Sequence, residues 1–281
     1  NAMIAAKVLI NQAGRGLPME VLSDAEFRVY SRAGEDGIIQ FLIAGMRIEN
    51  EFFVEFGVED YCESNTRFLM LNNNWAGFVM DSSARHIERI HRDPIFARHQ
   101  LEARCAHITK ENINELLRDA RCPSDIGLLS IDIDGNDYWV WEAIDAIVPR
   151  IVVCEYNSLF GAVDAVTIPY DPGFDRRKAH DSWLFFGASL PALCRLANRK
   201  GYLFVGCCKA GSNAFFVRRD VAGGFRKVSV SDGFRISHER EGRTPEGALS
   251  FVTGAARRDV IGDMKVLDLD RNSLRCVRDL S

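Results

Sequence analysis

The sequence predicts an α/β fold built on a Rossmann-like, doubly wound and mostly parallel sheet with an antiparallel edge hairpin. From residue 52 onward, short apolar runs alternate with stretches of helical periodicity, which is typical of βαβ units. Two later apolar runs, residues 202–208 and 214–219, flank a Lys-Ala-Gly-Ser-Asn turn, which predicts the hairpin. The 281 residues are about the size at which a single core stops growing, so we expect one large domain.

The pattern divides the chain into three segments. We expect a helical N-terminal segment over residues 1–51, an α/β domain over residues 52–220 and a C-terminal appendage over residues 221–281. In the first segment, Ser31 is placed to cap a helix over residues 33–46. In the appendage, Thr244-Pro245-Glu246 predicts a helix start, because it combines a cap, an N1 proline and an early acid.

Each element of the α/β domain has a local signal. Apolar runs predict strands over residues 52–56, 77–80, 101–107, 126–131 and 151–154. Helical periodicity predicts helices over residues 64–71, from a cap at Thr109 through Leu117, over residues 138–147, and from a cap at Ser189 to Lys200. The first helix should end at Asn72-Asn73-Asn74, where asparagine tolerates left-handed backbone, and the last at Gly201.

Composition excludes several classes of protein. The 47% apolar and 26% charged residues are typical of a globular chain and not of a disordered one. The 35 basic and 39 acidic residues give a net charge of −4, so no basic field favours nucleic acid. No apolar run approaches the roughly 20 residues of a membrane-spanning helix, so we expect no membrane partner.

The cysteines and the start of the chain indicate a reducing compartment. Eight cysteines are scattered without a CxxC pair or a zinc-binding spacing, so we expect reduced packing residues. The start, Asn1-Ala2-Met3, has the form of a tag remnant before a methionine and lacks the features of a signal peptide, which predicts a cytoplasmic protein. The sequence leaves a homo-oligomer open.

Ligands of doubly wound sheets bind at the carboxyl ends of the strands, so polar residues there are the functional candidates. The first strand ends in Glu55-Phe-Gly57, where the glycine permits close backbone approach and the buried acid would need a partner such as a sulfonium cation. The second ends in Asp81, about 20 residues later, the spacing at which an acid holds ribose hydroxyls. The alternatives are a solvated Glu55 and an Asp81 that caps the next helix.

A nicotinamide enzyme would use an acid in the same position as Asp81. It would also need Gly-x-Gly-x-x-Gly after the first strand, whereas Gly57-Val-Glu-Asp-Tyr-Cys has no second glycine. Glu59, Asp60 and Glu63 would in addition repel a pyrophosphate. The glycine pattern therefore disfavours a dinucleotide.

The clearest feature is Asp132-Ile-Asp134 at the end of the fourth strand. Alternation places Ser130, Asp132 and Asp134 on one side, and two acids at the end of a buried strand indicate a cation, metal or proton-transfer role. The fifth strand ends in Glu155, so Asp134 and Glu155 could face each other and hold Mg²⁺ through oxygen ligands. Asp137 is placed to cap the following helix.

Residues 158–187 form a long connection rich in aromatic residues. Connections of this length are usually lids or binding loops. We therefore expect a small-molecule acceptor to bind beneath it, covered by side chains such as Tyr170 and Trp183. His180, the one histidine in this connection, is a candidate general base.

Five stretches between residues 30 and 157 form a recognisable set. They are Tyr30-Ser-Arg-Ala-Gly-Glu-Asp-Gly-Ile-Ile39, Phe53-Val-Glu-Phe-Gly57, Ser64-Asn-Thr66, Trp75-Ala-Gly-Phe78 and Ile131-Asp-Ile-Asp-Gly135. Together they resemble FkbM-type methyltransferases, and the later segments resemble uncharacterised members of that family. The resemblance implies a class I methyltransferase fold, S-adenosylmethionine as cofactor, and O-methylation of a sugar or polyketide hydroxyl.

The resemblance also implies which residues contact the cofactor. Glu55 and Gly57 would contact its methionine part, Asp81 its ribose, and Glu35 or Asp36 its outer side. The full set expected to bind the cofactor is Glu35, Asp36, Glu55, Gly57, Asp81, Ser82 and Asp132.

The leading hypothesis is an S-adenosylmethionine-dependent O-methyltransferase for a sugar, polyketide or related small molecule. The fold would align donor and acceptor, and Asp134, Glu155 or His180 would remove the acceptor proton. The alternative is a binding or scaffold protein that has the methyltransferase fold without turnover, which the irregular glycine loop favours. A nicotinamide-dependent oxidoreductase is a third, less favoured hypothesis.

Overall fold

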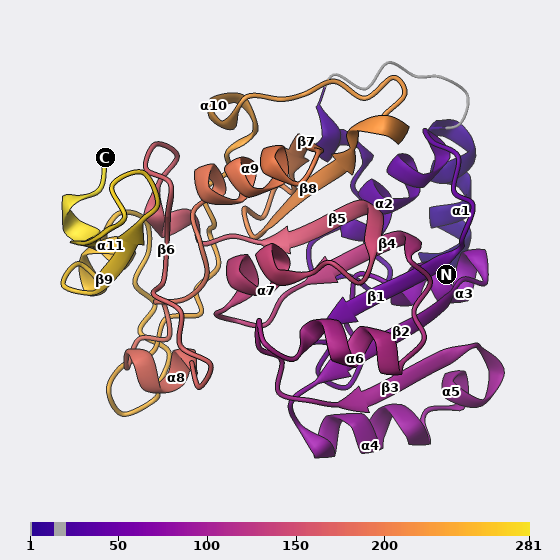
Figure 1. Ribbon diagram of the computed structural model, residues 1–281, viewed down its shortest axis with the longest axis horizontal. Coiled ribbons are helices and arrows are strands. Elements are labelled where there is room, and N and C mark those ends of the chain that lie inside the picture. The colour runs from indigo at the N-terminus through magenta and orange to yellow at the C-terminus, as the bar shows by residue number, and fades with distance from the viewer. Residues whose placement is uncertain (1, 14–20) are drawn as a thin grey trace.

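The computed structural model describes residues 2–13 and 21–281, and within them the main sheet has seven strands in the order β3-β2-β1-β4-β5-β8-β7 (Figure 1). The strands are β1 (Phe52–Phe56), β2 (Ala76–Asp81), β3 (Leu101–Cys105), β4 (Asp125–Ile131), β5 (Val148–Glu155), β7 (Tyr202–Cys207) and β8 (Asn213–Arg218). The first five pair in parallel, whereas β8 is antiparallel to both β5 and β7. The predicted parallel sheet and its closing hairpin are confirmed.

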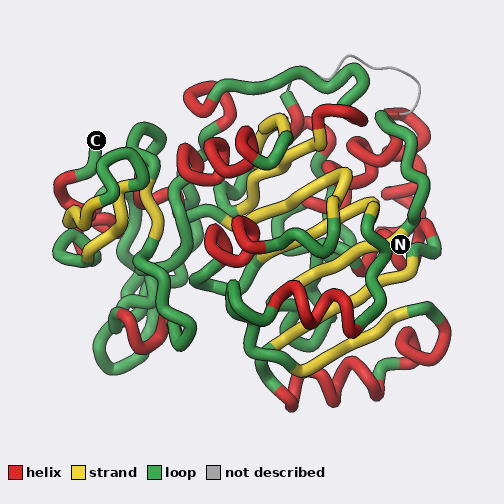
Figure 2. Tube along the Cα trace, in the orientation of Figure 1, coloured by secondary structure: helices red, strands yellow, loops and turns green. Residues whose placement is uncertain are grey.

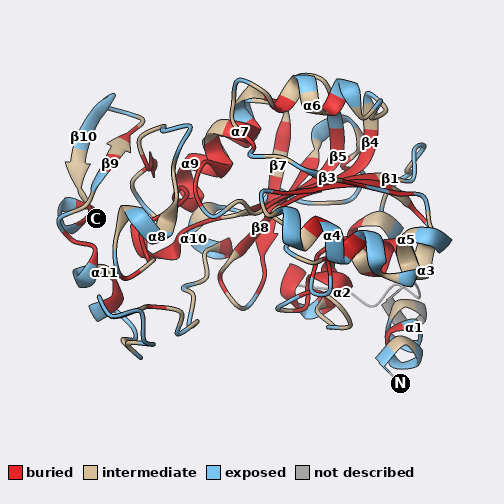
Figure 3. Ribbon diagram, turned by 90° about the horizontal axis from the view of Figure 1, so that it is seen from below, coloured by how far each residue is buried: buried red, intermediate tan, exposed pale blue. Residues whose placement is uncertain are grey.

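Helices cover both faces of the sheet and make a three-layer sandwich (Figure 3). One face carries α2 (Glu35–Ala44), α3 (Arg67–Asn73), α4 (Ala84–Arg92) and α5 (Pro94–Arg98), and α1 (Ala2–Ala13) packs on α2. The other carries α6 (Ile113–Asp119), α7 (Asp137–Ala143) and α9 (Leu190–Arg199). Along β1, Phe53 joins the core beneath α2, whereas Val54 and Phe56 join the core beneath α6 and α7. Because both faces are buried, the strands read as continuous apolar runs.

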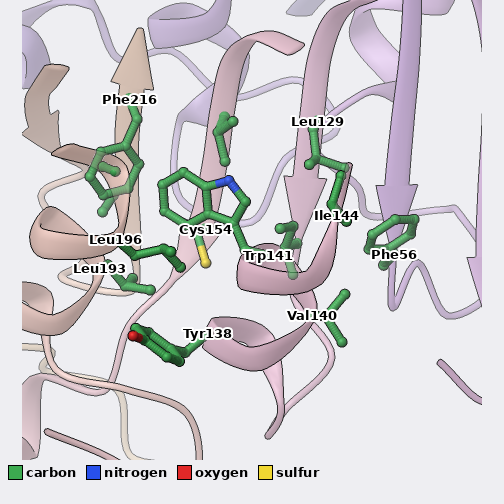
Figure 4. Packing of buried hydrophobic residues seen from close by; sticks show 14 of the residues in the cluster. Phe56, Leu129, Tyr138, Val140, Trp141, Ile144, Cys154, Leu193, Leu196 and Phe216 are labelled. Carbon is green, nitrogen blue, oxygen red and sulfur yellow. The ribbon is translucent and has the colours of Figure 1, made fainter. Parts of the chain in front are cut away.

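Trp141 of α7 lies at the centre of the larger core (Figure 4). Its ring centroid is 4.9 Å from that of Phe216 on β8 and 6.0 Å from that of Tyr202 on β7. Burying side chains of this size stabilises the fold by about 1.5–3 kcal/mol each. This packing fixes α7 and α9 against the sheet and so fixes the loops at the ends of β4 and β5.

Most helix ends follow their predicted signals. Asn74 ends α3 in the left-handed conformation at a φ of 58°, and Ser189 caps α9 by accepting a hydrogen bond from the N–H of Ala192. However, α7 ends at Ala143 rather than at residue 147. The side chain of Asn114 accepts hydrogen bonds from the next N–H groups and draws the chain out of the helix.

Several predicted helix starts differ from the structure: α3 begins at Arg67 instead of Ser64, and α6 begins at Ile113 with Asn112, not Thr109, at the cap position. Thr244-Pro245-Glu246 forms a tight turn in which the Thr244 carbonyl accepts a hydrogen bond from Gly247, because Arg243 and Leu249 pair across it in a β-bridge. Ser31 is not the cap of α2, which begins at Glu35 behind Gly34. Its hydroxyl still accepts a hydrogen bond from the N–H of Asp36 at 3.0 Å, from outside the helix.

A smaller lobe lies at the edge where the parallel strands end (Figure 1). Its three-stranded sheet joins β6 (Val166–Thr167) to β9 (Lys265–Asp268) and β10 (Ser273–Cys276). Figure 2 shows that most of the remaining lobe is loop, with the short helices α8 (Arg176–Ala179) and α11 (Ala256–Val260). The long connection and the C-terminal segment, which the sequence presents as separate, therefore share one structural unit and one apolar cluster.

The cysteines and the helices agree with what the composition predicts. All eight cysteines are free thiols. Of the helices in the described ranges, none combines the length and the apolar character that crossing a bilayer requires.

Candidate functional site

The strand order reverses between β1 and β4, and polar residues gather at the carboxyl ends of the strands on either side of this point. Phe53, Val79 and Val153 all pack beneath α2 to α4. Two residues further along each strand lie Glu55, Asp81 and Glu155, which alternation places on the same face. Asp132 follows Ser130 on β4 in the same way. The predicted acids of four neighbouring strands therefore share one face and one edge of the sheet.

Gly57 is needed where the chain leaves β1. Its φ is 74°, and a Cβ built on it would lie 1.6 Å from the carbonyl oxygen of Asp132. No larger residue fits this contact, which brings the loop after β1 directly against the loop after β4. Gly57 therefore allows the end of β1 to pack directly against the end of β4.

Glu55 is buried, and its partners all come from the loop that follows β1. Its carboxylate accepts hydrogen bonds from the Ser64 and Thr66 hydroxyls, at 2.9 and 2.5 Å, and from the N–H groups of Asn65 and Thr66. Burial raises the pKa of Glu55 above its usual value, and these hydrogen bonds, that of the Thr66 hydroxyl first, offset only part of the rise. Glu55 therefore holds residues 64–66 in a loop, which explains why α3 begins only at Arg67.

Asp81 has fewer internal partners than Glu55. One oxygen accepts a hydrogen bond from the N–H of Glu59 at 2.9 Å, and the other from Ser83 at 2.8 Å. The Nδ1 atom of His86 lies 3.1 Å from the second oxygen. His86, on the first turn of α4, is a neighbour that the sequence analysis missed, although its spacing of five residues from Asp81 could have indicated it. Ser82 beside it is exposed.

Glu35 and Asp36 lie beneath the surface, at 0% and 1% exposure. Asp36 accepts three backbone hydrogen bonds from Val29, Tyr30 and Ser31, at 2.7 to 2.9 Å. Glu35 accepts hydrogen bonds from the N–H of Ala33 at 2.8 Å and from Asn213 Nδ2 at 2.9 Å. In this arrangement both acids fix the chain that leads into α2.

Three acids converge at the ends of β4 and β5. One oxygen each from Asp132, Asp137 and Glu155 lies within 4.8 Å of the others. Asp137 also accepts hydrogen bonds from the N–H groups of Ile133 and Gly135, at 2.8 and 2.9 Å. Asp137 is thus the first residue of α7 and binds the loop before the helix. The cap position predicted for it is occupied by Asn136.

Burial and mutual repulsion raise the pKa values of this group. For Asp132, burial and then Asp134 and Asp137 raise the pKa well above its usual range. For Glu155, burial and then Asp132 have the same effect. Burial raises the pKa of Asp137 to about 6 against the lowering effect of its backbone hydrogen bonds. A cation or a shared proton is therefore needed to neutralise the negative charge of these three acids.

Asp134 takes a different partner from the one predicted. It stands at a φ of 56° with a side chain that is 55% exposed, and it forms an ion pair with Arg176 of α8. Arg176 also donates to the Trp183 carbonyl and contacts Glu241 at 2.9 Å. Sequence reasoning missed Arg176, because only the fold brings the connection over the end of β4.

His180 lies at the end of α8, in the lobe. Its Nδ1 accepts a hydrogen bond from the N–H of Ser182 at 3.1 Å and lies 2.8 Å from the Ser182 hydroxyl. With Nδ1 accepting, the neutral ring carries its proton on Nε2. Within the described residues, no hydrogen bond or ion pair joins His180 to Asp134 or Glu155.

The C-terminal segment 235–241 crosses the ends of β5 and β8. The Tyr156 hydroxyl donates to the Arg235 carbonyl at 2.5 Å, and Ser237 N–H donates to the Ser158 hydroxyl at 2.9 Å. Glu239 contacts Arg32 at 2.8 Å in front of α2. The segment that the sequence could not interpret therefore borders the candidate site.

No protein-family model matches this chain, and no curated protein is similar to it in sequence. Solved structures resemble it weakly. The N-terminal domain of EvdMO1 with SAH bound is 9% identical with a TM-score of 0.42 over 75% of this chain and 94% of that one. An O-methyltransferase from Bacillus cereus in complex with SAH is 14% identical with a TM-score of 0.41 over 74% and 89%.

The pyocyanin biosynthetic protein PhzM is 10% identical with a TM-score of 0.36, and the chain spans only 50% of its length. The assignment of the fold depends instead on the strand order. Parallel strands β3-β2-β1-β4-β5, followed by one antiparallel strand and an edge strand, make a Rossmann-like sheet of the class I methyltransferase type.

Proposed function

We propose that the chain is an S-adenosylmethionine-dependent O-methyltransferase of FkbM type that acts on a hydroxyl of a sugar, polyketide or related small molecule. The observation that carries this proposal is the point where the strand order reverses. There Gly57 at φ 74° meets the loop after β4, and Asp81 ends the adjacent strand β2 on the same face. Doubly wound sheets bind their ligands at this point.

The cofactor would lie along the ends of β1, β2 and β4. Asp81 would accept the ribose hydroxyl protons, with Ser82 beside it, and Gly57 would let the methionine part approach the backbone. The negative charge of Asp132 would attract the sulfonium. Glu55, Glu35 and Asp36 would act by positioning the surrounding loops, since each of these carboxylates already accepts hydrogen bonds from the protein.

Glu155 is the best-placed proton acceptor of the three candidates. Its Oε2 atom is buried without a hydrogen-bond partner among the described residues, and its raised pKa makes it able to take up a proton. Asp134 is held by Arg176, and the free nitrogen of His180 carries a proton in the neutral ring. We expect Glu155→Gln to lower turnover by about 10²–10⁴-fold.

The acceptor would bind beneath the lobe. Tyr170 and Trp183 are engaged elsewhere, Tyr170 with Glu111 and Lys110, and Trp183 between Arg177 and Arg243. Phe174 lies closer to the strand ends: a Cβ on Gly135 would be 2.4 Å from its ring. Phe174 is therefore the aromatic side chain that we propose faces the acceptor.

Calorimetry with S-adenosylhomocysteine and with NAD tests this function. Binding of S-adenosylhomocysteine alone supports it, and methyl transfer to a hydroxyl acceptor establishes the reaction. Binding of NAD alone would identify a nicotinamide-dependent oxidoreductase. Binding of neither ligand would leave the scaffold alternative, which the internal hydrogen bonds of Glu55 favour.

A further inference from the structure

Among the described residues, no cationic side chain forms an ion pair with the three acids at the ends of β4 and β5. Asp132, Asp137 and Glu155 take part in none of the ion pairs among the described residues, whereas Asp134 in the same loop pairs with Arg176. The two strands pair in register up to Ile131 and Cys154, so the next residues, Asp132 and Glu155, are direct neighbours. Buried carboxylates without a counter-charge are costly unless a cation or a proton neutralises them.

The geometry of the group is held before any ligand binds. Asp137 is 0% exposed, and each of its oxygens accepts one backbone hydrogen bond, from Ile133 and Gly135. Since a carboxylate oxygen has two lone pairs, each oxygen keeps one for a further ligand. The loop therefore holds Asp137 next to the other two acids and leaves a free lone pair on each of its carboxylate oxygens.

A buried amide oxygen provides a second observation. Asn213 on β8 lies directly opposite Glu155 in the antiparallel ladder, so the two side chains leave the same face of the sheet. Asn213 is 6% exposed, and its Nδ2 atom donates to Glu35 at 2.9 Å. Its Oδ1 atom is buried and has no hydrogen-bond partner in the described residues, as is true of Glu155 Oε2. Unsatisfied buried oxygens are rare, and two on facing residues indicate a missing partner.

We propose that a hard divalent cation of the Mg²⁺ or Mn²⁺ type binds between Asp132, Asp137 and Glu155, with Asn213 Oδ1 as a fourth oxygen. The donor set consists of oxygens alone, which these ions prefer, and it contains no thiolate or imidazole that would select zinc. Two positions of an octahedral ion remain for water or an acceptor hydroxyl. The site replaces the Asp134 and Glu155 pair expected from the sequence, and it does not depend on the proposed methyl transfer. While the ion is bound, Glu155 would be one of its ligands and would not act as the proton acceptor.

Titration of the full chain with Mn²⁺, followed by electron paramagnetic resonance, tests the proposal in chelator-treated buffer without any nucleoside ligand. We expect one Mn²⁺ per chain, displaced by Mg²⁺. Asp132→Asn and Glu155→Gln should each weaken binding by at least about 10-fold, since even supporting residues of metal sites have effects of that size. The matched control Asp134→Asn removes a nearby acid that is not a proposed ligand, and it should weaken binding clearly less than Asp132→Asn does.

Three results would overturn the proposal. One is the absence of stoichiometric Mn²⁺ binding by the folded wild-type chain. Another is an Asp134→Asn variant that loses as much affinity as Asp132→Asn, which would restore the other acid pair. The third is equal Mn²⁺ affinity of Asp132→Asn and wild type, with the fold of the variant verified by its thermal melting; a shared proton would then neutralise the acids.

Discussion

Acidic residues have different roles at the carboxyl ends of β1 and β2, here called the β1–β2 half of the site, and at those of β4 and β5, the β4–β5 half. In the β1–β2 half, Glu55 accepts hydrogen bonds from the loop after its own strand, and Asp81 accepts them from Glu59 in the loop after β1 and from Ser83 after β2. In the β4–β5 half, no hydrogen bond among the described residues ends on the side chain of Asp132 or Glu155. An acid at the end of a buried strand is therefore structural or available for a ligand depending on whether a nearby loop supplies donors.

The difference comes from the path of the chain after each strand. After β1 the chain turns back, and Ser64, Asn65 and Thr66 return to Glu55. After β5 it leaves the sheet for the lobe, and the lobe's arginine, Arg176, pairs with Asp134 and Glu241 rather than with Glu155. The following experiments compare the two halves.

The largest effect should come from Glu55→Ala. The change leaves two hydroxyls and two N–H groups buried without their acceptor, so the free energy of unfolding should fall by about 3–5 kcal/mol. Urea denaturation measures it. Glu51→Ala, an exposed acid just before β1, is the control and should change stability by less than about 0.5 kcal/mol. Equal stability of the two variants would show that the loop does not depend on Glu55.

Asp81→Ala should mainly change ligand binding. We expect the affinity for S-adenosylhomocysteine to fall about 10–100-fold, through loss of hydrogen bonds from the ribose to a charged acceptor. Calorimetry measures the change, with Glu88→Ala, an exposed acid on α4, as the charge-matched control. A similar loss in both variants would point to a general effect of charge and not to a ribose contact.

Asp132→Asn should stabilise the protein in chelator-treated buffer at pH 7. Because burial and neighbouring acids raise the pKa of Asp132, removal of its charge should increase stability by about 1 kcal/mol, or about 2–4 °C in Tm. Asp134→Asn should instead lower Tm slightly, since it breaks the contact with Arg176. A lower Tm for Asp132→Asn would mean that the charge of Asp132 is already stabilised by groups of the protein.

The smallest effect concerns Asp268 in the lobe, an acid with many donors. Burial would raise its pKa, but the Arg271 N–H and the Arg275 and Arg271 side chains lower it well below its usual range. Its contribution to stability is thus present above the unfolded pKa and is lost as the pH falls through the folded value. Asp268→Asn should melt below wild type at pH 7, and the difference should shrink progressively as the pH falls below about 4, the unfolded pKa of an aspartate. A difference independent of pH would contradict this assignment.

Much of the fold could be predicted because its signals are local. Alternation and apolar runs placed the strands β1 to β5, and Ser189 and Asn74 marked helix ends as expected. The helix expected at Thr244 failed, since pairing between Arg243 and Leu249 overrode a local signal. Glu55 had the right position, but its partners lie 9 to 11 residues away, beyond the reach of any periodicity.

The sequence by itself determined that four acids would stand at the carboxyl edge of a parallel sheet, because the side-chain period of a strand fixes the face of each residue. Only the tertiary structure decided which acids are satisfied. Hydrogen-bond partners such as Asn213 for Glu35, or Arg176 for Asp134, come from segments 42 to 178 residues away. Their meeting depends on how loops and the lobe pack around the sheet, and this packing leaves Asp132 and Glu155 without an ion pair among the described residues.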